Sequence, residues 1–153
     1  MLLHPFVVHF TIALLAIAVV CDGLHLVTQK PKFWRYTNFL LVIGTLAAIA
    51  AVVTGNQAHD AVEIAREIKP LVREHRNSGE WTMRVFIFLT TMRFIFAKLK
   101  WFQKPLKWIY YAVAIIAFVF IFRTGLMGNE IAYIHGVGSE KTEKPLLKKP
   151  SFD

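Results

Sequence analysis

Long runs without charged residues constrain this chain more than any other feature. Residues 2–21, 39–55 and 108–122 contain no Lys, Arg, Asp or Glu, and the last run continues past Arg123. A helix that crosses a bilayer needs about 20 consecutive, mostly apolar residues. The three runs therefore predict three membrane-spanning helices.

A fourth apolar stretch, Trp81–Phe96, is interrupted by Arg84 and Arg93. We interpret it as a further span that buries its arginines against neighbouring helices. The alternative is three spans with an interfacial third helix. The predicted fold is thus all-α: an integral membrane, up-down four-helix bundle over residues 1–135, followed by a polar tail over 136–153.

Composition excludes several other classes of protein. Hydrophobic residues make up 56% of the chain and charged residues 18%, against about 25% charged residues in soluble domains. Disorder and a soluble enzyme with a large polar surface are therefore excluded. Cys21 is the only cysteine, so the chain is no disulfide scaffold.

The net charge is +8, and the positions of the basic residues along the chain agree with the expected topology. No Lys or Arg precedes the first span, whereas Lys30, Lys32 and Arg35 follow it closely. The connection before the last span adds four lysines and no acid: Lys98, Lys100, Lys104 and Lys107. The positive-inside rule places these connections in the cytoplasm and both termini in the periplasm. Anionic lipid accounts for the basic charge, so we expect no nucleic-acid partner.

The periplasmic connection, residues 56–79, has a helical pattern of its own. Small or apolar residues and one histidine recur every three or four positions: Ala58, Ala61, Ala65, Ile68, Val72 and His75. This spacing is typical of an amphipathic helix. We expect one near the periplasmic surface between the second and third spans, kinked at Pro70.

Five of the six histidines gather at the periplasmic end in this topology: His4, His9, His59, His75 and His135. Imidazole is the commonest metal ligand and binds haem iron axially. Interfacial polar residues are the alternative interpretation. His4 and His9 lie about 140° apart around a helix, so both cannot face one iron. We expect one haem with His9 opposite His135 or His75, and leave open a second cofactor or a small metal site that uses His4.

Small residues mark two of the expected spans. They lie at Gly44, Ala48, Ala51 and Gly55 in the second span, and at Thr124, Gly128 and Ala132 in the last. Such stripes allow close helix packing, and they also leave room for a flat macrocycle.

Three arginines in the expected spans need partners. Arg93 and Arg123 each lie 12 residues from the periplasmic ends of their spans, about 18 Å, and Asp22 lies at a similar depth. We therefore predict a structural ion pair of Asp22 with Arg93 or Arg123. Arg84 lies nearer the periplasm, where it can bind a carboxylate such as a haem propionate.

The motifs His4-Pro5-x-x-Val8-His9-Phe10 and Tyr133-x-His135-Gly136-Val137-Gly138 resemble the signatures of a bacterial family of predicted four-span membrane proteins of unknown function. Thr54-Gly55 and Gly125-x-x-Gly128 are further matches. Some members are fused to Rieske-type iron–sulfur domains, which implies electron transfer by association. The resemblance also implies the bacterial inner membrane, and it carries over His4, His9, His75 and His135.

The leading hypothesis is a membrane electron-transfer subunit that holds haem b near its periplasmic face. Its partner in electron transfer would be a periplasmic cytochrome c or iron–sulfur protein. The second hypothesis is a cofactor-free accessory subunit of a larger respiratory or photosynthetic complex. The third is a transition-metal-binding membrane protein. The sequence has no nucleophile–base constellation, no CxxCH and no phosphate loop. We therefore do not expect an enzyme that acts alone, although it can be a subunit of an oxidoreductase complex.

Overall fold

The computed structural model describes residues 3–60 and 66–134, and these ranges are helical almost throughout. The long helices are α1 (Leu3–Thr28), α2 (Pro31–Asp60), α3 (Lys69–Lys98) and α4 (Lys107–Asn129). A 3₁₀ turn, Trp101–Gln103, precedes α4, and a π-helical turn, Glu130–Ile134, follows it. The predicted all-α class is confirmed, since the described ranges contain no strand.

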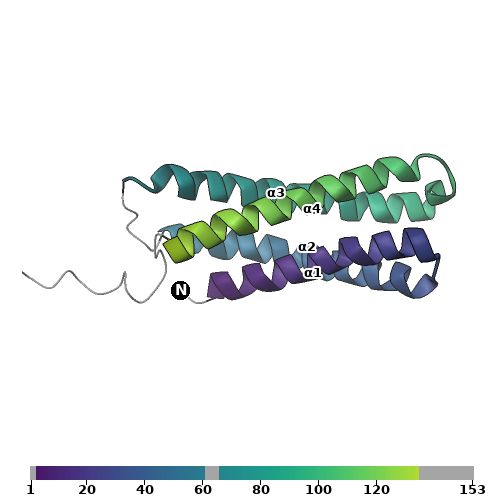
Figure 1. The fold of residues 1–153 in the computed structure, drawn as a ribbon, viewed down its shortest axis with the longest axis horizontal. Helices are drawn as coiled ribbons and strands as arrows, with labels where there is room; N and C mark the ends of the chain where they lie inside the picture. Colours follow the sequence, from purple (N-terminus) through teal and green to yellow (C-terminus); the bar gives the residue numbers. More distant parts are fainter. Residues whose placement is uncertain (1–2, 61–65, 135–153) are drawn as a thin grey trace, which may run out of the picture.

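Three stretches of helix are long and apolar enough to cross a membrane: Leu3–Thr28, Pro31–Ala58 and Lys107–Ala132. α3 has 30 residues and lies alongside them (Figure 1), but it carries more charge. At 1.5 Å per residue α3 is about 45 Å long, which exceeds the roughly 30 Å of a hydrocarbon core. Most of the charged residues of α3 lie in its first turns.

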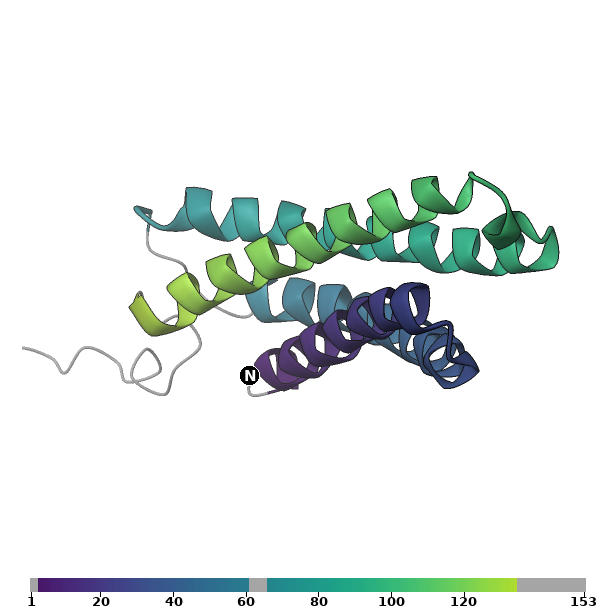
Figure 2. The ribbon, with the colours of Figure 1, turned by 45° about the vertical axis from the view of Figure 1, so that its right-hand side comes forward.

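The helices form two antiparallel hairpins, α1–α2 and α3–α4, each packed most extensively within itself. Figures 1 and 2 show the hairpins lying against each other along their length. The two hairpin connections share one end of the bundle, and each contains a residue with positive φ, Gln29 or Lys100. The N-terminus lies at the opposite end, which we call the open end of the bundle.

The expected amphipathic helix over residues 56–79 is not a separate element in the described ranges. Residues 56–60 belong to α2, and α3 begins at Lys69 and continues without interruption to Lys98. Residues 61–65 lie outside the described ranges. Pro70 stands in the first turn of α3, where proline is favoured because its missing N–H is unbonded there anyway. It therefore begins a helix instead of kinking one.

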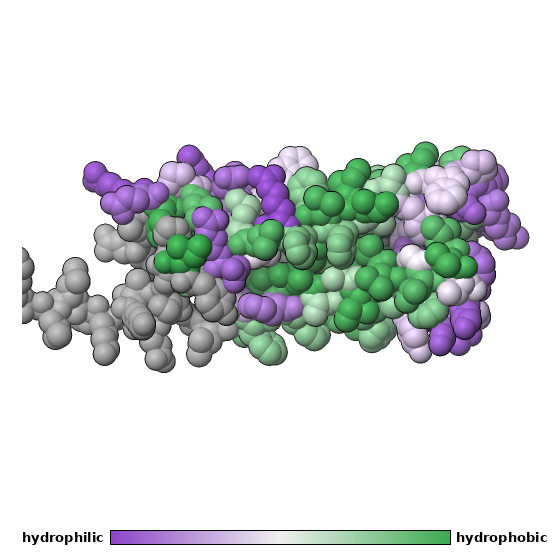
Figure 3. Space-filling model, in the orientation of Figure 1, coloured by the Kyte–Doolittle hydropathy of each residue, from purple (hydrophilic) through white to green (hydrophobic). Residues whose placement is uncertain are grey.

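Apolar side chains fill the core and also cover the outside of the bundle. Leu15, Leu41, Phe86 and Leu89 are buried. Exposed large hydrophobic residues include Phe6, Phe39, Phe88, Trp108 and Val119. Figure 3 shows hydrophobic side chains over the middle of the bundle and hydrophilic ones over its ends, including the first turns of α3. An apolar surface of this extent is that of a protein in contact with lipid.

One buried arginine joins all four helices near the end that carries the hairpin connections. The Arg93 guanidinium is fully buried and forms an ion pair with Asp22 of α1, which is 2% exposed. Its Nε donates to Asn38 Oδ1 of α2 at 2.8 Å, and its Nη1 donates to Tyr110 of α4 at 3.3 Å. The guanidinium carbon lies 3.7 Å from the centre of the Trp34 ring.

Arg93 and Arg123 were the two candidate partners of Asp22, and in the structure Asp22 pairs with Arg93. Arg123, the other candidate, lies on the outer surface and pairs with Glu74 of α3 at 2.8 Å, with both side chains more than half exposed. Arg123 reaches Glu74 because the first turns of α3 extend alongside the last turns of α4.

Replacing Asp22 by Ala should destabilise the bundle by about 3–5 kcal/mol, because removing one partner leaves a buried charge without compensation. Unfolding of the detergent-solubilised protein, followed by circular dichroism, measures the effect. Glu74→Ala is the matched control, since its exposed pair is worth about 0–1 kcal/mol. Equal stabilities of the two variants would refute a stabilising role for the buried pair.

Candidate functional site

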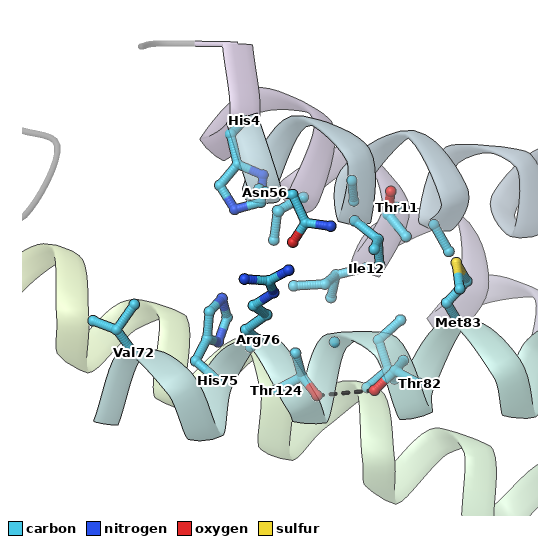
Figure 4. A pocket seen from close by; sticks show the side chains of 18 residues that line it. His4, Thr11, Ile12, Asn56, Val72, His75, Arg76, Thr82, Met83 and Thr124 are labelled. Atoms are coloured by element: carbon cyan, nitrogen blue, oxygen red, sulfur yellow. Dashed lines mark hydrogen bonds between the residues drawn. The ribbon is translucent and has the colours of Figure 1, made fainter. Parts of the chain in front are cut away.

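A cleft opens between the two hairpins at the open end of the bundle. Eighteen residues line it, and they come from all four long helices. The cavity of the cleft measures about 120 Å³. Most of the lining is apolar, and the polar groups that point into it are few (Figure 4).

His4 reaches the cleft from the first turn of α1. Its Nδ1 lies 3.2 Å from the hydroxyl oxygen of Thr54 on α2, and that hydroxyl in turn lies 2.9 Å from the Ala50 carbonyl oxygen. The Thr54 oxygen can accept from His4 Nδ1–H while its own proton is donated to the carbonyl. In that tautomer the Nε2 lone pair of His4 is available to a ligand.

His75 faces His4 from α3 on the other side of the cleft (Figure 4). It precedes the apolar part of α3, which begins at Trp81. Burial, together with the nearby charge of His4, lowers the pKa of His75 below its ordinary value of 6.5. Its Nδ1 is buried and has no hydrogen-bond partner among the residues that the structure describes. A neutral imidazole with unused hydrogen-bonding capacity therefore lines the cleft.

A glycine of the neighbouring helix lies behind each of these rings. A Cβ atom built on Gly55 of α2 would lie 2.9 Å from Cε1 of His4. A Cβ atom on Gly128 of α4 would lie 3.0 Å from Cε1 of His75. Both distances are too short for a side chain, so the small-residue stripes of α2 and α4 make room for the two imidazoles.

Arg76 is the one cationic side chain in the cleft lining, next to His75 (Figure 4). Its Nε lies 3.7 Å from Glu80 Oε1, and the side chain is partly exposed. The other polar side chains of the lining are Thr11, Asn56, Thr82 and Thr124. Thr124 Oγ1 lies 2.9 Å from Thr82 Oγ1 and 2.6 Å from Ser78 Oγ. The arrangement thus offers two imidazoles to a metal and one guanidinium to an anion.

The expected pairing of His9 with His75 does not form. His9 is exposed on α1, and its Nδ1 lies 2.7 Å from the Pro5 carbonyl oxygen. Because His4 and His9 point about 140° apart, only one of them can face the cleft, and packing against α2 selects His4. His135 lies outside the described ranges, as does the tail over 136–153, and the side chain of His59 is not described.

Arg84 also lies away from the cleft. It pairs with Glu80 at 3.1 Å and lies over the Trp81 ring at 5.2 Å. Arg76, two helical turns earlier, takes the place at the cleft that the sequence analysis gave to Arg84. Sequence reasoning also missed the role of Thr54, although Thr54-Gly55 was part of the resembling motif. In both cases the available sequence signal was a neighbouring residue. Arg76 directly follows His75, and Thr54 directly precedes Gly55.

No curated protein and no solved structure matches this chain. One family profile does match, and it covers residues 2–141, nearly the whole sequence. The chain therefore belongs to the family described as predicted membrane protein DUF2231.

Proposed function

We propose that this protein is a membrane electron-transfer subunit that binds one b-type haem in the cleft, with His4 and His75 as the axial ligands. The observation that carries the proposal is the pair of imidazoles that face each other from opposite hairpins across an apolar cleft. Paired histidines on facing helices are a common means of holding a cofactor in a helix bundle.

The residues of the cleft suit such a group in chemistry. Two imidazoles would provide axial ligands, and the glycines behind them let the rings sit close to the helix backbones. The Nδ1 atom of His75 has no partner in the described ranges. Cofactor sites usually measure about 300–1,000 Å³. The cavity, at about 120 Å³, is smaller, so a macrocycle would fill it and extend through its open side.

A bound haem would supply one-electron chemistry, and the side chains of this protein would control it. His4 and His75 would hold the iron. Thr54 would keep His4 in the tautomer whose Nε2 is free. Arg76 would bind a propionate carboxylate, for which a guanidinium is well suited. The apolar lining would exclude water and thereby influence the reduction potential.

The proposal includes four membrane crossings, with α3 as the third. The Asp22 carboxylate compensates the buried charge of Arg93, which removes the main obstacle to placing α3 in lipid. Lys30, Lys32, Lys98 and Lys100 lie at the end with the hairpin connections, so the positive-inside rule puts that end in the cytoplasm. The cleft then faces the periplasm of a bacterial inner membrane. There, a cytochrome c or an iron–sulfur protein of a larger complex could exchange electrons with it.

The direct test is a reduced-minus-oxidised absorbance spectrum of the protein purified in mild detergent. We expect a Soret band and a sharp α band in the wild type, and loss of the α band in His4→Ala and His75→Ala. His9→Ala is the matched control and should leave the spectrum unchanged, because His9 lies outside the cleft. A flat spectrum from folded wild-type protein would refute haem binding. Elemental analysis would then separate a transition-metal site from a cofactor-free accessory subunit.

Thr54→Val should weaken haem binding about 10–100-fold, the usual cost of removing a hydrogen bond to a metal-ligating histidine. The variant keeps the shape of Thr54 but cannot accept the His4 N–H. Thr54→Ser should restore wild-type affinity, because it returns the hydroxyl. Titration with hemin measures the dissociation constants. Equal affinities of Thr54→Val and the wild type would show that His4 does not depend on Thr54.

A further inference from the structure

The two hairpins repeat each other in the positions of their buried residues. Leu15, Ala18 and Cys21 of α1 correspond to Phe86, Leu89 and Met92 of α3, always 71 positions later. Thr37, Leu41 and Ala48 of α2 correspond to Tyr110, Ala114 and Ile121 of α4, always 73 positions later. The two offsets, 71 and 73, differ by two residues because the connection between α3 and α4 is longer than the connection between α1 and α2.

The repeat extends to identical residues with identical local contacts. Thr11 donates to the carbonyl four residues before it at 2.8 Å, and its counterpart Thr82 does the same at 2.8 Å. His4 and His75 are counterparts at the same spacing. A Cβ atom built on Gly55, or on Gly128 73 positions later, would lie at nearly equal distances from the Cε1 atoms of these two rings.

The cleft itself is lined by counterparts. His4, Thr11 and Ile12 line it from one hairpin, and His75, Thr82 and Met83 line it from the other. Ala51 and Val52 of α2 are likewise matched by Thr124 and Gly125 of α4. α1 and α3 both begin at the open end of the bundle (Figure 1). Repeats that run in the same direction are related by an axis along the membrane normal.

We infer that the cleft consists of two equivalent half-sites, one from each hairpin, related by a pseudo-twofold axis along the bundle. Its ligand lies on that axis and presents equivalent groups to His4 and to His75. This inference rests on the proposed function and specifies the ligand class. A planar metal macrocycle meets this requirement, because it offers one metal coordination position on each of its two faces.

The counterparts are not all alike. Thr54, which contacts His4, has Met127 as its counterpart. Arg76 has Pro5 as its counterpart.

A further pair differs in charge. Asp22 and Arg93 occupy equivalent positions, 71 residues apart, and they pair with each other between the hairpins. The surroundings of this pair also differ, because Trp34, which stacks on Arg93, has Lys107 as its counterpart. The ion pair therefore fixes how the two hairpins meet, and the half-sites at the other end keep their matched positions.

Titration of the full-length protein with hemin in detergent micelles tests the equivalence. Gly55→Ala and Gly128→Ala each push a methyl group against one of the two rings. Both should raise the dissociation constant about 10–100-fold, and the two factors should agree within about threefold. Gly23→Ala is the matched control for the glycines, because a Cβ atom on Gly23 meets nothing within 4 Å. His9→Ala is the second control, because His9 lies outside the cleft. Neither should change the affinity.

The histidines provide a second pair of variants that introduces no clash. His4→Ala and His75→Ala should each convert the six-coordinate spectrum to the same five-coordinate, high-spin spectrum. A strong effect of one member of either pair beside a negligible effect of the other would overturn the inference, because it would reveal a one-sided site.

If the wild type binds no hemin, the proposed function fails while the half-sites can still be tested. In the ligand-free protein, Gly55→Ala and Gly128→Ala should then lower the Tm by similar amounts, and the two control variants should not lower it. Unequal shifts would overturn the equivalence of the half-sites.

Discussion

The bundle depends on the burial of one guanidinium. An unpaired charge in an apolar interior is very costly, yet Arg93 is fully buried among four helices. Asp22 neutralises it, Asn38 and Tyr110 accept its hydrogen bonds, and Trp34 stacks on its face. These partners come from three helices: Asp22 from α1, Trp34 and Asn38 from α2, and Tyr110 from α4. The charge therefore forces α1, α2 and α4 to meet α3 in one arrangement, since any other would leave the guanidinium without compensation.

The two ends of the bundle differ as a result. At the end with the hairpin connections, Phe102 packs edge to face on Phe96 and on Tyr110, with centroid distances of 5.8 and 5.0 Å, and the rings of Phe102 and Tyr110 lie 5.3 and 5.5 Å from the Arg93 guanidinium carbon. At the open end, glycine, alanine and threonine line the facing helices. The same two hairpins thus make a rigid contact at one end and enclose a cleft at the other. The histidines lie at the end where space is available.

Hydropathy predicted the apolar helices, because a run of 20 apolar residues has few alternatives to a membrane span. Depth along a helix also predicted that Asp22 and Arg93 share a level. Depth could not decide between Arg93 and Arg123, since the direction of a side chain around its helix depends on tertiary packing. The same limit applies to His4 and His9. Their spacing shows that only one faces inward, but contact with Gly55 and Thr54 decides which. The repeat of 71 and 73 residues contains too few identities to be evident before the buried positions are known.

The repeat explains why the chain has matched histidines at one end and opposite charges at the other. In a symmetric pair of identical hairpins, the residue at position 22 would meet its own copy near the axis, and two aspartates or two arginines would repel each other there. Joining the hairpins in one chain allows the two copies to differ. Asp22 and Arg93 then become complementary, which favours association of the hairpins. His4 and His75 stay identical, as do Thr11 and Thr82, which is the arrangement needed by a ligand that binds both hairpins in the same way. Among the counterparts that line the cleft, His4 and His75 are identical, as are Thr11 and Thr82, whereas the opposite charges of Asp22 and Arg93 join the two hairpins at the other end.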